Sequence, residues 1–130
     1  MTDTDIRQLV EEDPYCEMLG IDLLEIEPGA ATTRLTVAEA LTNFYGMPHG
    51  GAVYSLADAA FAAASNSRGD TAVALEANIS YLEAVDVGAV LTATAAETSA
   101  TERTAEYEVV VTDDDGERVA TFRGRAYKPD

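Results

Sequence analysis

The chain has few of the residues that build disulfides and metal clusters. Its 130 residues include one cysteine, Cys16, and one histidine, His49. A single cysteine cannot form an intrachain disulfide, and one residue of each kind cannot build a Cys/His metal cluster. We therefore predict no metal site, and we interpret Cys16 as a small, buried or half-buried thiol. A chain of this length buries a sufficient core without crosslinks, which predicts one domain over residues 1–130.

Targeting and membrane-spanning segments are also missing. The first residues, MTDTDIRQLVEEDP, are acidic and lack the basic region and apolar stretch of a signal peptide. The longest apolar run, residues 50–64, contains Asp58. It is also shorter than the roughly 18 apolar residues that a transmembrane helix needs. These observations predict a cytoplasmic protein that does not bind membranes.

Basic residues are scarce. Eight lysines and arginines stand against 24 acidic residues, for a net charge of −16, and Lys128 is the single lysine. Nucleic-acid binding needs a basic surface that displaces counterions from phosphates, so we predict none. The acids are spread along the chain, which indicates a solvated acidic surface. Such a surface resembles that of proteins from extreme halophiles, since the screening length falls to about 3 Å at 1 M salt. A moderately acidic protein from a low-salt organism is the alternative.

The pattern of apolar residues predicts the order helix, two strands, long helix, four strands, without internal repeats or linkers. The expected elements are a helix over 4–12, strands over 20–27 and 30–38, a loop over 39–48, a helix over 50–66, and strands over 71–83, 88–98, 101–112 and 117–127. The helix over 50–66 is apolar around most of its circumference, so it must be covered on most sides. A sheet wrapped around it would provide that cover, and the fold class is α+β.

Two local interpretations support these boundaries. The pair Asp13-Pro14 is expected to end the first helix, because the residue before a proline disfavours the helical region. The strand over 71–83 alternates with a period of two, which places five apolar residues on one face: Val73, Leu75, Ala77, Ile79 and Tyr81.

One acidic residue, Asp58, lies inside the long apolar helix. Burying an ionised carboxylate without a partner is costly, and residues 50–66 contain no lysine or arginine. Asp58 therefore faces solvent, pairs with a donor from another segment, or lies in a cleft with a raised pKa. Helical spacing puts Gly51, Ser55 and Ala62 on the same side as Asp58, which leaves room for a ligand there.

The pair Gly50-Gly51 stands where the same helix begins. Amides at this position have no partner inside the helix, and with the helix dipole they stabilise negative charge developing on an attacked carbonyl oxygen. The alternative is that the glycines only permit a sharp turn, and that His49 and Asn43 are ordinary loop residues. Gly51 and Asp58 are seven residues apart, about 10 Å along a helix, so both cannot touch one carbon atom within one subunit. We therefore predict a dimer in which Gly51 of one chain faces Asp58 of the other.

These residues together resemble the hotdog-fold thioesterases of the phenylacetic-acid-degradation type. The likeness covers residues 20–127 and rests on Asn43, His49-Gly50-Gly51, Ser55 to Asp58, Asn66-Ser67 and Tyr81. It implies a long central helix wrapped by a curved antiparallel sheet, with dimers as the minimal active unit and homotetramers as the common assembly. It also implies hydrolysis of an acyl-coenzyme A (acyl-CoA) thioester, where CoA is part of the substrate and no separate cofactor is needed.

The resemblance also implies roles for single residues. Asp58 would be the general base or the nucleophile, and the Gly51 amide would polarise the thioester carbonyl. Asn43 and His49 would position water or substrate. The expected substrate-binding residues are Gly50, Ser55, Asn66, Ser67 and Tyr81. Small residues on the long helix, Ala59, Ala62 and Ala63, leave space for an aromatic or medium-chain acyl group, or simply pack against the sheet.

Two other functions remain open at this point. A hydratase or dehydratase on the same fold would use a nearby acid and histidine to move protons at an enoyl thioester. A non-catalytic acyl-CoA sensor would need the pocket alone, and would gain nothing from Asp58.

Overall fold

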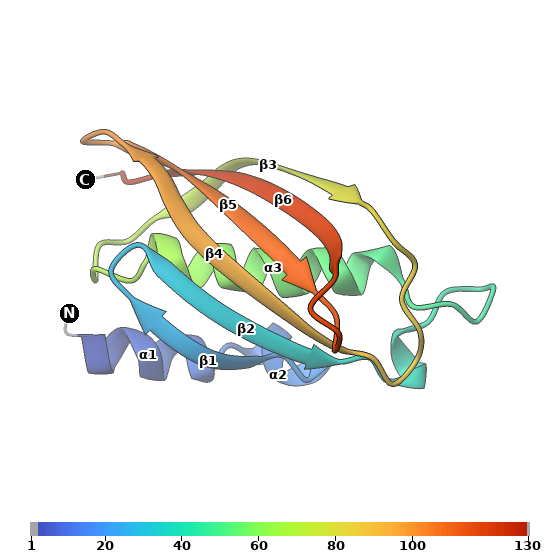
Figure 1. The fold of residues 1–130 in the computed structure, drawn as a ribbon. Helices are drawn as coiled ribbons and strands as arrows, with labels where there is room; N and C mark the ends of the chain where they lie inside the picture. Colours follow the sequence, from blue (N-terminus) through green and yellow to red (C-terminus); the bar gives the residue numbers. More distant parts are fainter. Residues whose placement is uncertain (1–2, 130) are drawn as a thin grey trace.

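One long helix, α3 (Gly50–Ser65), lies against a six-stranded antiparallel sheet in the computed structural model, which describes residues 3–129 (Figure 1). The strands are β1 (Asp22–Glu27), β2 (Ala30–Thr36), β3 (Val73–Tyr81), β4 (Val90–Ala100), β5 (Thr104–Thr112) and β6 (Arg118–Tyr127). The remaining elements are α1 (Asp3–Glu11), α2 (Pro14–Leu19) and a short 3-10 helix, η1 (Glu39–Leu41). The predicted α+β hotdog architecture is confirmed.

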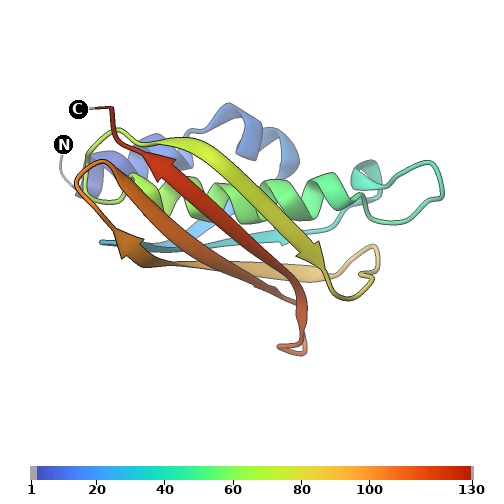
Figure 2. The same ribbon diagram turned by 90° about the horizontal axis from the view of Figure 1, so that it is seen from above.

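The strands follow the order β1-β2-β4-β5-β6-β3, so β1 and β3 form the two edges of the sheet. Tight turns join β1 to β2, β4 to β5 and β5 to β6, and each of these pairs is antiparallel. The chain leaves α3 and returns as β3 beside β6, at the far edge from β1 (Figures 1 and 2). Large apolar side chains on and just after β3 are exposed: Val73, Leu75, Tyr81 and Leu82.

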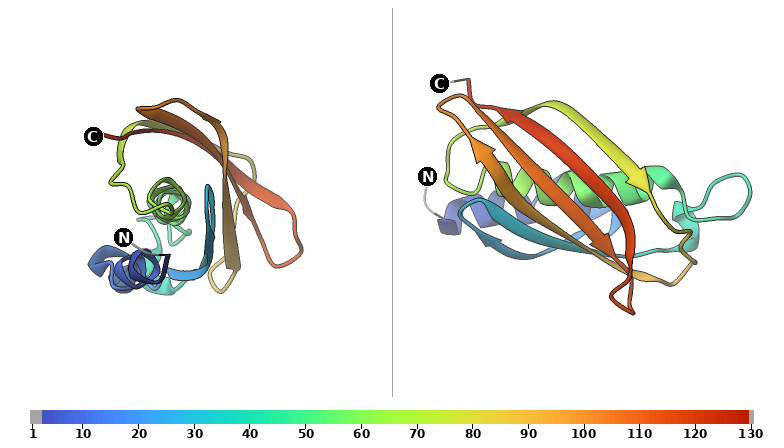
Figure 3. Two further views of the ribbon diagram at one scale, coloured as in Figure 1. Left: turned by 90° about the vertical axis from the view of Figure 1, so that its left-hand side faces the viewer. Right: turned by 45° about the horizontal axis from the view of Figure 1, so that its top comes forward.

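The core lies between α3 and the concave face of the sheet. Viewed along α3, the sheet curves around one side of the helix, and α1 and α2 lie beside another (Figure 3, left). Alanines let α3 approach the strands closely, and Phe61 packs edge-on against Tyr107 with ring centroids 5.6 Å apart. A Cβ atom at Gly124 on β6 would lie 2.7 Å from the Phe61 ring, so this position has room only for glycine. The predicted wrapping of an apolar helix by a sheet is therefore confirmed.

The helix α2 is absent from the prediction, which treats Asp13-Pro14 only as the end of the first helix. That interpretation is incomplete, because Pro14 is also the first residue of α2, where its missing N–H costs nothing. The Asp13 carboxylate caps α2 by accepting from the backbone N–H groups of Tyr15 and Cys16, each at 3.0 Å. Gly20, with φ of 85°, ends α2 in the left-handed conformation.

The predicted regular alternation of β3 is wrong at its start. The pairing with β6 shifts between Ala74 and Glu76, which leaves Leu75 in a bulge. Ala77 pairs with Gly124 on the face toward α3, whereas Val73 pairs with Tyr127 on the opposite face. An extra residue in a bulge reverses the faces before it, and counting by twos cannot detect this.

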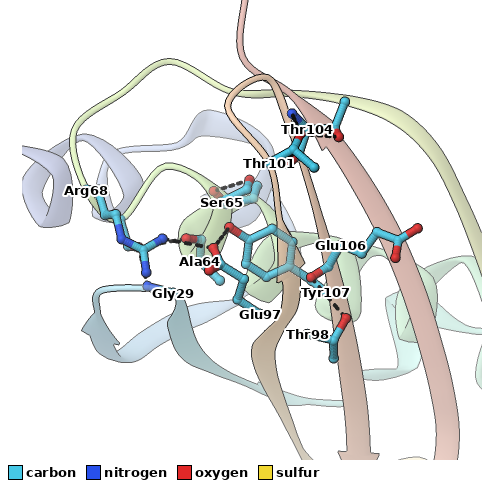
Figure 4. A network of polar contacts seen from close by, with 12 residues as sticks. Gly29, Ala64, Ser65, Arg68, Glu97, Thr98, Thr101, Thr104, Glu106 and Tyr107 are labelled. Carbon is cyan, nitrogen blue, oxygen red and sulfur yellow. Dashed lines mark hydrogen bonds and ion pairs between the residues drawn. The ribbon is translucent and has the colours of Figure 1, made fainter.

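A polar network closes the end of the molecule at the C-terminus of α3 (Figure 4). Glu97 on β4 accepts from the Arg68 guanidinium at 2.8 Å and from the Tyr107 hydroxyl at 2.8 Å. The three residues come from the loop after α3, from β4 and from β5, so one carboxylate ties three segments together.

Candidate active site

Asp58 lies half-buried in the middle of α3, on the side where Gly51 and Ala62 are exposed. Burial raises the pKa of Asp58, and the carboxylate of Asp13 raises it further. No ion pair reaches Asp58 in the described part of the chain, where the pairs are Arg7–Glu11, Arg68–Glu97 and Arg125–Glu76. The acid is thus unpaired and more basic than a surface aspartate, which is the condition that suits a general base.

The helix α2 lies beside this side of α3. The hydroxyl groups of Tyr15 and Ser55 are hydrogen-bonded at 2.9 Å. Cys16 is half-buried, as predicted, and burial, Asp13 and Asp58 together raise the pKa of its thiol to about 11. The thiol therefore stays protonated at neutral pH, and is not a nucleophile in this structure.

The N-terminus of α3 is capped by His49. The Nδ1 atom of His49 accepts a hydrogen bond of 2.8 Å from the Gly51 N–H, the same amide that the sequence assigns to the substrate carbonyl. Both residues are exposed. A carbonyl oxygen reaches the Gly51 amide only after the imidazole turns away, so His49 and the carbonyl compete for one donor.

Asn43 shapes the loop that precedes α3. Its Oδ1 atom accepts from the backbone N–H groups of Tyr45 at 2.9 Å and Met47 at 3.2 Å. The loop projects beyond the end of α3 (Figures 1 and 2), and its Phe44 side chain is 90% exposed. The Asn43 oxygen therefore has a structural role here, and within the described residues its Nδ2 group remains available to a ligand.

A cleft of about 340 Å³ opens between the start of α3 and the end of β3. Two of the expected substrate-binding residues meet there, because the Tyr81 hydroxyl donates to the Gly50 carbonyl at 2.8 Å. The other lining residues are mostly apolar: Met47, Pro48, Val53, Leu82, Glu83, Ala84 and Val85. The cleft suits an uncharged part of a ligand better than a phosphate, because its single charged residue is the acidic Glu83.

Asn66 and Ser67 lie at the opposite end of α3. The Asn66 side chain donates to the Ala62 carbonyl at 2.9 Å and accepts from the Ala72 N–H at 2.9 Å. The buried Ser67 hydroxyl donates to the Ala64 carbonyl and accepts from the Gly29 N–H. These contacts hold the end of α3 to its neighbours. The structure gives both side chains a structural role and does not bring them to Asp58, which is eight residues and about 12 Å from Asn66.

The structure adds residues that sequence reasoning missed. Asp13, at the start of α2, acts on Asp58, and Tyr15 on α2 bonds Ser55, one turn before Asp58. Residues 82–85 line the cleft beside Gly50. The pair Asp13-Pro14 is a cap followed by a first-turn proline, and is the signal by which α2 could have been found. Within residues 3–129 no group of three or more metal-ligating side chains has the arrangement of a metal site, and no helix is long and apolar enough to span a bilayer.

The wrapped helix and the strand order define the hotdog class of proteins, and three comparisons agree with it. The model of the family described as "Thioesterase superfamily" matches residues 45–120. Acyl-coenzyme A thioesterase PaaI of Escherichia coli K12 is 36% identical over 120 residues, covering 92% of this chain and 86% of that protein. The chain belongs to the thioesterase superfamily, and is therefore classed with the thioester hydrolases.

Solved structures are similar over the same range. The E. coli PaaI protein from the phenylacetic acid degradation operon has a TM-score of 0.93 at 34% identity, covering 98% of this chain and 92% of that one. A Streptococcus mutans protein solved with bound acetyl CoA has a TM-score of 0.79 at 27% identity, covering 83% and 87%.

Proposed function

We propose that the protein hydrolyses an acyl-CoA thioester to a free acid and CoA. The observation that carries the proposal is Asp58, a half-buried acid with a raised pKa and no cationic partner in the described chain, beside small side chains that leave space. The name of the E. coli relative and the acetyl CoA held by the S. mutans protein support a CoA thioester as the substrate. The apolar cleft beside Gly50 suits a medium-chain or aromatic acyl group, or the uncharged arm of CoA.

Asp58 has two chemical routes to the same products. As a general base it takes a proton from water while the water oxygen bonds to the carbonyl carbon, and the C–S bond then breaks to release the CoA thiolate. As a nucleophile its carboxylate oxygen attacks the same carbon and expels the thiolate, and water then hydrolyses the resulting mixed anhydride. In both routes negative charge develops on the carbonyl oxygen, where the Gly51 amide at the N-terminus of α3 stabilises it once His49 has turned away.

The reaction needs two protomers. Gly51 and Asp58 of one chain are separated by about two helical turns, so we assign the Gly51 amide to one protomer and the acid to Asp58 of the partner subunit. The exposed edge strand β3 supports this assembly, because its unpaired backbone groups and apolar side chains favour pairing with a second β3. A dimer is the minimal active unit, and a tetramer of two such dimers stays a prediction from the family resemblance.

The first test replaces Asp58 by asparagine, which keeps the shape and removes the base. We expect Asp58→Asn to lower kcat by about 100-fold or more, the size of general base contributions, with unchanged circular dichroism. The assay follows thiol release from a panel of acyl-CoA esters. Asp70→Asn, an exposed acid in the loop after α3, is the matched control.

The readout also separates the other candidate functions. A hydratase would remove enoyl absorbance without releasing thiol, and a sensor would bind the esters without turnover. A rate for Asp58→Asn within a few fold of the wild-type protein would refute the role of Asp58.

The second test asks whether two chains share one site. A Cβ atom at Gly51 would lie 3.0 Å from His49 Nδ1, so Gly51→Val forces the imidazole to move and places a bulky side chain beside the amide. We co-express Asp58→Asn and Gly51→Val chains with different tags and purify the mixed dimer. Each homodimer is expected to be inactive, whereas the mixed dimer contains one intact site of two and turns over at about half the wild-type rate. An inactive mixed dimer would contradict the shared site.

A further inference from the structure

Tyr15 is held in place from both ends of its short helix. Asp13 caps α2 at the start, and the Gly20 N–H returns to the Cys16 carbonyl at 2.9 Å at the end. Ile21, the next residue, is buried in the core, and its N–H also bonds the Cys16 carbonyl at 2.9 Å. These bonds give α2 one defined position against α3.

The two sides of α2 differ. Cys16 and Leu19, one turn apart, pack against the core. Tyr15 and Met18, also one turn apart, are 55% and 72% exposed. The helix is six residues long, and it leaves the Tyr15 and Met18 side chains largely uncovered by the core.

Tyr15 contacts α3 one helical turn before Asp58. Its hydroxyl is 2.9 Å from the Ser55 hydroxyl, and Ser55 is only 8% exposed and stands one turn before Asp58 on the same side of α3. The other positions on this side, Gly51 and Ala62, carry almost no side chain. Tyr15 is thus a large side chain anchored one helical turn from the acid, and a buried serine holds its hydroxyl.

We propose that Tyr15 is a specificity-determining residue, whose ring, held by the Ser55 hydroxyl, bounds the acyl pocket beside Asp58 and limits the length of the acyl group. The inference rests on the proposed thioesterase function and names a boundary of its substrate class. The carbonyl carbon must lie at Asp58, so the acyl tail starts within reach of α2. Short and flat aromatic acyl groups fit beside the ring, whereas a long straight chain must pass the position that the ring occupies.

The test compares kcat/KM for butyryl-, octanoyl-, dodecanoyl- and benzoyl-CoA. Removing the ring in Tyr15→Ala is expected to raise the dodecanoyl-to-butyryl ratio by about tenfold or more, within the range that pocket contacts discriminate. Tyr15→Phe keeps the ring but loses the hydrogen bond to Ser55, so its ratio is expected to rise by less than that of Tyr15→Ala. Leu9→Ala on α1, a similarly exposed apolar residue, is the control and leaves the ratio unchanged.

The outcomes test the role of Tyr15 separately from the thioesterase function. If Tyr15→Ala does not fold, Tyr15→Leu removes the ring with less loss of volume and is expected to shift the ratio in the same direction. A folded variant without the ring whose ratio stays within twofold of the wild-type protein overturns this inference and leaves the thioesterase proposal intact. A wild-type protein that releases no thiol from any ester overturns the proposed function, and this inference with it.

Discussion

Asp58 shows how a single residue couples function to stability. Its carboxyl is half-buried beside Asp13 and has no ion-pair partner in the part of the chain that the structure describes. Burial and Asp13 disfavour the ionised form and raise the pKa above the usual 3.8. A carboxyl of this kind costs stability at neutral pH, and a fold retains it only where the charge has a use.

The stability cost predicts a pH-dependent difference between the wild-type protein and Asp58→Asn. Because the pKa of Asp58 is raised in the folded protein, the protonated carboxyl contributes stability. This contribution is fully present below pH 3.8 and is lost as pH rises through the folded pKa. Asp58→Asn is therefore expected to melt a few degrees higher than the wild-type protein at pH 7, and the difference should narrow as pH falls toward 3.8. Thermal melts over this pH range provide the measurement. A variant that melts lower at pH 7 would show that the carboxylate has a stabilising partner.

At the scale of elements, local sequence patterns predicted most of the helices and strands. The uniformly apolar residues 50–66 predict a buried helix, and α3 covers Gly50–Ser65. The residues Asp114-Asp115-Gly116 predict the turn of a hairpin, and the turn between β5 and β6 forms there with Gly116 at φ of 78°. The bulge at Leu75 and the helix α2 were missed, because a bulge depends on how β3 fits β6, and because Asp13-Pro14 both ends one helix and begins the next.

The Glu97 network makes a prediction at this scale (Figure 4). Burial acts to raise the pKa of Glu97, but hydrogen bonds from Arg68 and Tyr107 outweigh it and hold the pKa below the usual 4.5. A carboxylate whose pKa is lowered in the folded protein stabilises the fold above pH 4.5, and this stabilisation is lost as pH falls through the folded pKa. Glu97→Gln is therefore expected to lower the free energy of unfolding by about 1 kcal/mol at pH 7, and by less at pH 4.

Denaturant unfolding at both pH values measures the effect, and Glu106→Gln, an exposed acid on the neighbouring strand, is the control. Equal losses in the free energy of unfolding for the two variants would show that the Glu97 network does not stabilise the fold.

At the scale of the whole molecule, the net charge of −16 is the dominant property. Within residues 3–129, three cations pair with acids: Arg7, Arg68 and Arg125. The remaining repulsion between carboxylates destabilises the compact state, and is relieved when salt shortens the screening length. A salt-rich habitat for this protein stays a prediction from composition.

The charge predicts that stability rises with salt. We expect the melting temperature to increase from 0.1 M to 2 M KCl, because screening shortens from about 10 Å to under 3 Å. Replacing three exposed acids by lysine, Glu102, Asp115 and Glu117, is expected to flatten this dependence. Calorimetry of both proteins across the KCl series is the measurement. A wild-type melting temperature equal at both ends would contradict the halophile interpretation.

By itself the sequence determined the α+β class, the apolar central helix, the isolated acid within it and the acidic surface, because periodicity, composition and the position of one charge are local properties of the chain. Only the tertiary structure showed that Tyr15 bonds Ser55 and that His49 accepts from the Gly51 amide. It also showed that Asn66 and Ser67 bond the segments next to the C-terminal end of α3. These contacts join segments from different elements, or depend on the direction in which a side chain turns. The contacts of Tyr15 with Ser55 and of Ser67 with Gly29 are set by packing between elements, and the local bond of His49 to Gly51 is set by the direction of the imidazole.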